Sequence, residues 1–113
     1  MKFKDKVIWI TGAASGIGEA LAYQSVKYGA KLILSDIDES RLSDVGSKCE
    51  GMNTEVYILP FDLASRDSVE ESVKQAVGRY GRVDVLINNG GLSQRSLTWE
   101  TPLEVDYRIM NIN

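Results

Sequence analysis

The 113-residue sequence contains no histidine, and it has only one cysteine and two prolines. The absence of histidine excludes catalysis by a histidine base and any metal site built on imidazole ligands. The single cysteine, Cys49, cannot form an internal disulfide or a cysteine cluster. We therefore expect no metal site, and we expect a reducing compartment, the cytoplasm.

Long apolar runs and a surplus of basic residues are also missing. The apolar run after the basic N-terminus, Val7–Ile10, has only four residues. A signal peptide needs about 7–15 apolar residues and a membrane span about 20, so we expect no membrane segment in this chain. Thirteen basic against sixteen acidic residues give a net charge of −3, which argues against nucleic acid as a partner. A hydrophobic fraction of 43% is enough to form the core of one domain.

Short apolar runs alternate along the chain with segments of helical period. The apolar runs predict four strands, at residues 7–10, 31–35, 56–59 and 83–87. Three helices are predicted between them: one behind a glycine-rich loop, one capped by Asp38 and one opened by Ser65 or Asp67. This alternation predicts an α/β fold in which right-handed crossovers join parallel strands into an open, doubly wound sheet with helices on both faces.

A fourth helix is predicted to begin at Pro102, because Thr101 opens a capping box and proline favours the first helical position. Apolar residues from Leu103 to Met110 stay in its period, and the sequence reaches Asn113 without a helix stop signal. We therefore expect residues 1–113 to form one domain that is truncated within this helix. The edge of the fourth strand is then expected to lack a neighbour and to invite pairing.

A glycine-rich loop, residues 11–18, joins the first predicted strand to the first predicted helix. Gly12 permits a tight turn, Gly16 lets a ligand approach the backbone, and Gly18 lets the helix pack close to the sheet. The amides at the helix N-terminus favour a pyrophosphate, and the Ser15 hydroxyl can join the same cradle. No Lys-Ser/Thr pair follows the last glycine, which excludes a P-loop. The alternative is a strand–helix turn whose glycines serve the backbone only.

Asp36 ends the second predicted strand, eighteen residues after Gly18. A carboxylate there can accept hydrogen bonds from an adenosine ribose, and it would repel a 2′-phosphate. The usual basic partner of that phosphate is missing, because Ser15 precedes Gly16 and Ile37 follows Asp36. The sequence therefore favours NAD over NADP. The alternative is that Asp36 is a polar strand end or a helix cap.

The loop TGAASGIG resembles the TGxxxGxG motif of the short-chain dehydrogenase/reductase family, and further segments match that family at the later predicted strand ends. The resemblance implies a Rossmann-type doubly wound parallel sheet, of which this chain forms the N-terminal half, with strand order 3-2-1-4. The segments 93–96 and 99–101 are similar to the branch that includes the seventh dehydrogenase/reductase member and its bacterial relatives. The implied cofactor-binding residues are Gly12, Ser15, Gly16, Ile17, Gly18, Asp36, Ile37, Asp62, Leu63, Asn88, Asn89 and Gly90.

The resemblance also implies individual roles after the third and fourth strands. Asp62 accepts from the adenine amino group while Leu63 packs on the ring, unless Asp62 is simply a turn residue. Of Asn88 and Asn89, one braces the neighbouring strand ends and the other meets the cofactor ribose. Gly90 stands where the family has alanine, so we expect a somewhat looser loop.

The implied activity is reversible hydride transfer between a nicotinamide and an alcohol or ketone. Members of the family use a Ser, a Tyr, a Lys and a supporting Asn, and only the Asn is matched here, by Asn113. The pair Tyr23 and Lys27 has the Tyr-x-x-x-Lys spacing but lies on the first helix, so we interpret it as unrelated to catalysis. We expect the 113 residues alone to be inactive and the complete parent to be a homo-oligomer. The alternative is a natural short protein that binds nucleotide or a partner without catalysis.

Overall fold

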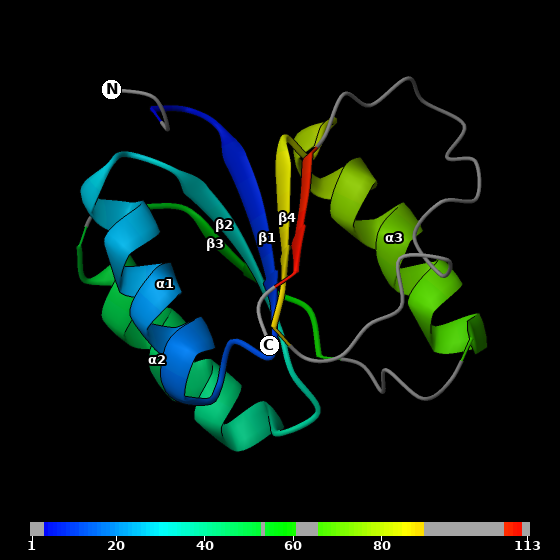
Figure 1. The fold of residues 1–113 in the computed structure, drawn as a ribbon, viewed down its shortest axis with the longest axis horizontal. Helices are drawn as coiled ribbons and strands as arrows, with labels where there is room; N and C mark the ends of the chain where they lie inside the picture. The colour runs from blue at the N-terminus through cyan, green and yellow to red at the C-terminus, as the bar shows by residue number, and fades with distance from the viewer. Residues whose placement is uncertain (1–3, 53, 61–65, 90–107, 112–113) are drawn as a thin grey trace.

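The computed structural model describes residues 4–52, 54–60, 66–89 and 108–111, the last four by their backbone (Figure 1). Strands and helices alternate along these residues as the sequence predicts, up to the fourth strand. The strands are β1 (Val7–Thr11), β2 (Lys31–Ser35), β3 (Val56–Ile58), β4 (Val85–Asn88) and β5 (Arg108–Asn111). The helices are α1 (Gly16–Lys27), α2 (Glu39–Glu50) and α3 (Arg66–Tyr80).

The strands form one parallel sheet in the order β3-β2-β1-β4-β5. Its first four members confirm the predicted order 3-2-1-4. Thr11, at the end of β1, lies opposite Ser35 of β2 on one side and Asn88 of β4 on the other. The carboxyl ends of these three strands therefore meet at one edge of the sheet.

Helices cover both faces of the sheet, with α1 and α2 on one face and α3 on the other (Figure 1). All five residues of β1 are buried, which explains its unbroken apolar run. Val7 and Trp9 pack in the same hydrophobic cluster as Val73 of α3. Ile8 and Ile10 belong to a second cluster that includes side chains of α1 and α2. The fold is thus a three-layer α/β/α sandwich with a core on each side of the sheet.

Local signals set where the helices begin and end. The Asp38 side chain accepts a hydrogen bond from the Arg41 backbone N–H at 3.1 Å, which confirms the predicted cap of α2. Helix α3 begins at Arg66, between the two residues proposed as its start. After α1, Gly29 has a φ of 84°, a left-handed conformation that turns the chain towards β2.

The prediction for the segment after β4 is wrong over residues 108–111. The sequence predicted a helix that begins at Pro102 and is still continuing at Asn113, whereas Arg108–Asn111 form β5, paired parallel to β4. Residues 102–107 lie outside the described part of the chain. The physical reason is that an uncovered β4 would leave a row of backbone N–H and C=O groups unpaired. Pairing satisfies them, so β4 does not have the open edge that the sequence suggested.

Candidate dinucleotide-binding site

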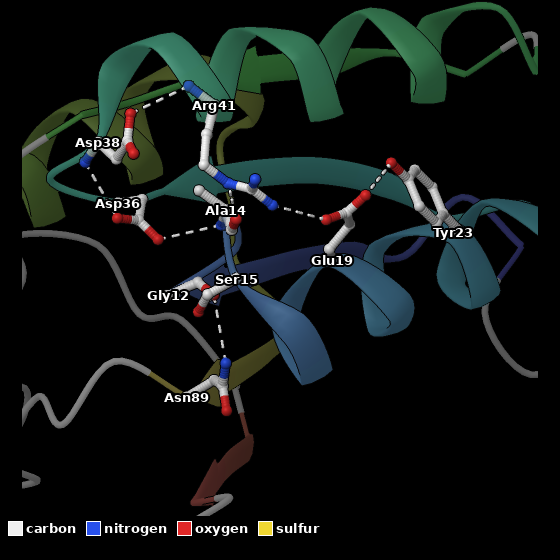
Figure 2. Close-up of polar contacts among 9 residues, drawn as sticks. All are labelled: Gly12, Ala14, Ser15, Glu19, Tyr23, Asp36, Asp38, Arg41 and Asn89. Carbon is white, nitrogen blue, oxygen red and sulfur yellow. Dashed lines mark hydrogen bonds and ion pairs between the residues drawn. The ribbon is translucent and has the colours of Figure 1, made fainter.

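The candidate site lies at the carboxyl edge of the sheet, where the strand order reverses. Strand β1 has β2 on one side and β4 on the other, and the chain after each of these strands contributes to the edge. These are the glycine loop after β1, Asp36 after β2 and Asn89 after β4 (Figure 2). In open α/β sheets, ligands bind in the crevice outside such a reversal.

The glycine loop has the backbone geometry that its spacing predicts. Gly12 has a φ of 67°, so the tight turn after β1 uses a conformation that other residues rarely adopt. A Cβ on Gly18 would lie 2.1 Å from the Gly12 carbonyl oxygen, which confirms that α1 packs too closely for a side chain there. A Cβ on Gly16 would meet no described atom within 4 Å. The Gly16 side of the loop is therefore open enough for a ligand to approach.

Two asparagines at the end of β4 hold the glycine loop and the end of β1 in place. The side-chain oxygen Oδ1 of the buried Asn88 accepts a hydrogen bond from the Thr11 hydroxyl at 3.0 Å. The Asn89 side-chain amide donates to the Gly12 carbonyl oxygen at 3.2 Å, and its backbone N–H donates to the Thr11 carbonyl oxygen at 3.3 Å. Both asparagines thus brace the end of β1 and its loop. The predicted ribose contact of one of them stays a prediction.

The β2 side braces the loop through Asp36. One carboxylate oxygen accepts from the Ala14 backbone N–H at 3.0 Å, and the other accepts from the Asp38 backbone N–H at 3.0 Å. These contacts fix the half-buried carboxylate beside the loop (Figure 2). Each oxygen retains a further lone pair, so the group can still accept from ribose hydroxyls. The capping role that the sequence left open for Asp36 belongs to Asp38.

Two exposed apolar side chains flank the site. Ile17 follows Gly16 in the first turn of α1 and is 53% exposed, and Ile37 follows Asp36 and is 69% exposed. Ser15 is the N-cap residue of α1, but its hydroxyl makes no cap bond and donates only a long 3.4 Å contact to the Gly12 carbonyl. The hydroxyl and both isoleucines are therefore available to a bound molecule. Their cofactor contacts stay predictions.

Arg41 is a residue at this site that sequence reasoning missed. Its Nε donates to the Ala14 carbonyl oxygen at 2.8 Å, and its guanidinium pairs with Glu19 of α1 at 3.2 Å. The sequence predicted no basic side chain beside Asp36, because Ser15 precedes Gly16 and Ile37 follows Asp36. The available signal was that Arg41 lies in the first turn of a helix capped by Asp38. A long side chain from that turn reaches the glycine loop.

Tyr23 lies beyond this ion pair and does not have the character of a catalytic base. Burial, together with the hydrogen bond that its hydroxyl donates to the Glu19 carboxylate at 2.8 Å, raises the pKa of Tyr23 to about 12. A tyrosine that takes a proton near neutral pH needs its pKa lowered. This agrees with the interpretation that Tyr23 and Lys27 are not the family's catalytic pair.

Several predicted site residues lie outside the described part of the chain. They are Asp62, Leu63, Gly90 and Asn113, together with the segments 93–96 and 99–101. Among the residues that the structure does describe, no group of three or more potential metal ligands is found. In the same residues, no helix combines the length and apolar character that crossing a membrane requires.

Comparisons with known proteins point to one family. The family model "short chain dehydrogenase" matches residues 6–113. The human Dehydrogenase/reductase SDR family member 7 is 43% identical over 113 residues, which cover 96% of this chain and 33% of that protein. The CLA biosynthesis dehydrogenase/reductase of Lactiplantibacillus plantarum is 40% identical over 111 residues, or 98% of this chain and 39% of that protein. The chain therefore spans between a third and two fifths of the length of these curated relatives.

Solved structures agree with this result. A short chain dehydrogenase/reductase from Burkholderia phymatum, crystallised in complex with NAD, superposes with a TM-score of 0.76 at 34% identity. The match covers 80% of this chain and 32% of that chain. The fold of this chain thus occurs in a related protein whose crystal structure was determined in complex with NAD.

Proposed function

The chain belongs to the short-chain dehydrogenase family, and from that membership we propose that it is the NAD(P)-binding part of an oxidoreductase. The reaction of the complete protein is hydride transfer between a nicotinamide cofactor and an alcohol or ketone. The observation that carries the proposal is the braced glycine loop at the reversal point of the sheet, in front of the N-terminus of α1.

The residues of this edge fit a dinucleotide. The first backbone N–H groups of α1 have no partner within the helix, and together with the helix dipole they favour the negative charge of a pyrophosphate. The open side of Gly16 lets the phosphates come close to the backbone. Asp36 is placed to accept from the adenosine ribose, and Ile37 offers an apolar surface to the adenine. When bound, the cofactor supplies the nicotinamide ring that gives or takes the hydride.

Within this function we propose a preference for NAD. Hydrogen bonds from the Ala14 and Asp38 amides fix both oxygens of the Asp36 carboxylate, so it cannot turn away from an incoming 2′-phosphate. The guanidinium of Arg41 is engaged by the Ala14 carbonyl and by Glu19, and its charge is largely compensated there. Like-charge repulsion by Asp36 is therefore the stronger influence on a 2′-phosphate.

We further propose that these 113 residues bind cofactor without turning it over. The only Tyr-x-x-x-Lys in the sequence is Tyr23 to Lys27, and Tyr23 has a raised pKa and a partner in Glu19. The alternative is a natural short protein that binds nucleotide or a partner without catalysis. Such a partner would need a surface other than the β4 edge, because β5 pairs with that edge.

The test is calorimetric titration of the chain with NADH, followed by an assay for NAD-dependent oxidation of simple alcohols. The proposal predicts one binding site per chain and no turnover. Absence of any NADH or NADPH binding by the folded chain would contradict cofactor binding. Appreciable turnover would contradict the assignment of catalysis to residues outside this sequence.

A further inference from the structure

Arg41 connects three parts of the molecule that the sequence keeps apart. It stands in the first turn of α2, donates from Nε to the Ala14 carbonyl in the glycine loop, and pairs through Nη2 with Glu19 on α1. The two contacts measure 2.8 and 3.2 Å. Figure 2 shows the guanidinium extending along the loop between Ala14 and Glu19.

The contact with Ala14 completes a set of hydrogen bonds around one peptide group. The Ala14 carbonyl accepts from Arg41, and the N–H of the same peptide, which is that of Ser15, donates to the Gly12 carbonyl at 3.4 Å. The preceding N–H, that of Ala14, donates to Asp36. Ala14 itself is only 2% exposed. Hydrogen bonds therefore hold both peptide groups before α1, Ala13–Ala14 and Ala14–Ser15. Arg41 is the side chain that holds the Ala14–Ser15 peptide.

The orientation of this peptide determines where α1 begins. Ser15 is the N-cap residue, with φ −129° and ψ 140°, and its carbonyl accepts from the Gly18 and Glu19 amides. A rotation of the Ala14–Ser15 peptide would therefore tilt the first turn of α1 and redirect its free amides. Those amides are the groups that the proposed function assigns to the pyrophosphate.

Glu19 keeps the guanidinium in this orientation. One carboxylate oxygen pairs with Arg41 and the other accepts from the Tyr23 hydroxyl. The Arg41 side chain is 58% exposed, so the ion pair by itself adds little to stability. Its effect is geometric, because the planar guanidinium can serve the carboxylate and the Ala14 carbonyl at once. A lysine ammonium is a point charge on a flexible stem and lacks this fixed fork.

We propose that Arg41 is a positioning residue for pyrophosphate binding: it holds the glycine loop and the start of α1 in place without touching the cofactor. This role rests on the proposed function of the site. The competing arrangement is direct contact of the guanidinium with an adenosine 2′-phosphate, which would require Arg41 to leave Ala14.

The experiment compares Arg41→Ala and Arg41→Lys with the unsubstituted chain and with Lys48→Ala. Lys48 is an exposed residue in the last turn of α2, so its substitution removes the same charge from the same helix away from the loop. Titrations with NADH, ADP, adenosine and NADPH give the affinities. The ¹⁵N shift of the Ser15 amide in the unliganded chain reports the peptide that Arg41 holds.

We expect Arg41→Ala to weaken the binding of NADH and of ADP by about tenfold, which is the effect of losing one hydrogen bond to a charged group. Adenosine, which has no phosphate, should bind unchanged, and Lys48→Ala should bind every ligand as before. The affinities of Arg41→Lys for NADH and ADP should lie between those of Arg41→Ala and of the unsubstituted chain. Its Ser15 resonance should move in the same direction as in Arg41→Ala. Equal losses for adenosine and NADH would instead show general damage to the fold and overturn the role.

Two other outcomes separate the remaining possibilities. Unchanged NADH and ADP affinity in Arg41→Ala, with the unsubstituted chain binding normally, overturns the positioning role and leaves the proposed function intact. A loss for NADPH much larger than for NADH also overturns it, because Arg41 is then a direct phosphate ligand. Failure of the unsubstituted, folded chain to bind NADH overturns the proposed function itself.

Discussion

Single side chains at the carboxyl edge serve two purposes at once, bracing the loop and preparing a surface for a ligand. Asp36 accepts from two backbone amides, and Asn89 donates to the Gly12 carbonyl. Sequence reasoning located Asp36 because it directly follows a predicted strand, and Asn89 because the segment after the fourth strand resembles a motif of a known family. Arg41 could not be located in this way, since its contact with Ala14 joins positions 27 residues apart and depends on how α2 lies against the loop. Site residues at the ends of strands could therefore be predicted from the sequence. The contact made by Arg41 could not, because it depends on how a helix packs.

The charge of Asp36 leads to a prediction about cofactor preference. Asp36→Asn should lower the ratio of the NADPH to the NADH dissociation constant by about tenfold, because a like charge no longer faces the 2′-phosphate. Fluorescence titration with both reduced cofactors at low ionic strength measures this ratio. Asp44→Asn is the matched control, since it removes the same charge from an exposed position of α2. An unchanged ratio in Asp36→Asn, or an equal change in the control, would contradict the preference for NAD.

The buried thiol of Cys49 leads to a prediction about stability at alkaline pH. Burial raises its pKa to about 11, with a smaller contribution from the nearby Glu19 and Glu50 carboxylates. In the unfolded chain the thiol titrates near its ordinary value of about 8.5. Between these two pKa values the unfolded state loses a proton that the folded state keeps, so the free energy of unfolding falls as pH rises.

Urea unfolding between pH 8 and 11 measures this dependence. We expect the unsubstituted chain to lose stability more steeply over this window than Cys49→Ala, which lacks the titrating thiol. The comparison concerns slopes, because the substitution also removes buried volume and lowers stability at every pH. Parallel slopes for the two proteins would contradict the raised pKa.

At the scale of elements, the short apolar runs predicted strands correctly. The helical period after β4, in contrast, predicted a helix where residues 108–111 form a strand. β1, β2 and β4 are buried on both faces, so local sequence already shows them as short apolar runs. β5 was predicted as helix because its residues continue a helical period. Its strand conformation comes from pairing with β4, whose residues lie more than 20 positions away. Local propensity is a weak guide where tertiary pairing decides the conformation.

The junction of β1 and α1 leads to a prediction about glycine. Gly18→Ala should destabilise the chain by about 1–3 kcal/mol and weaken NADH binding, because its Cβ would meet the Gly12 carbonyl, which must then move. Gly78→Ala is the matched control within α3, where an added Cβ meets no described atom within 4 Å. That change should stabilise the chain by about 0.5–1 kcal/mol. Equal effects in urea unfolding would contradict the close packing at Gly18.

At the scale of the whole molecule, hydrogen bonds with residues after β2 and β4 hold the glycine loop at the carboxyl edge of the sheet. The sheet carries the loop, Asp36 and Asn89 at one edge, which suits the adenosine and pyrophosphate side of a dinucleotide. The alternation of strands and helices predicted the open parallel sheet, and the resemblance to a known family implied the strand order 3-2-1-4 that the structure confirms. The chain covers 33% and 39% of the lengths of the two curated relatives.

The most direct test of the account is the chemical-shift map of the ¹⁵N-labelled chain titrated with NADH. The account predicts saturable shifts concentrated in the amides of residues 12–18 and 36–37, with little change in α3 on the opposite face of the sheet. Shifts spread over α3, or none at all in the folded chain, would contradict the claim that this edge binds a nicotinamide dinucleotide.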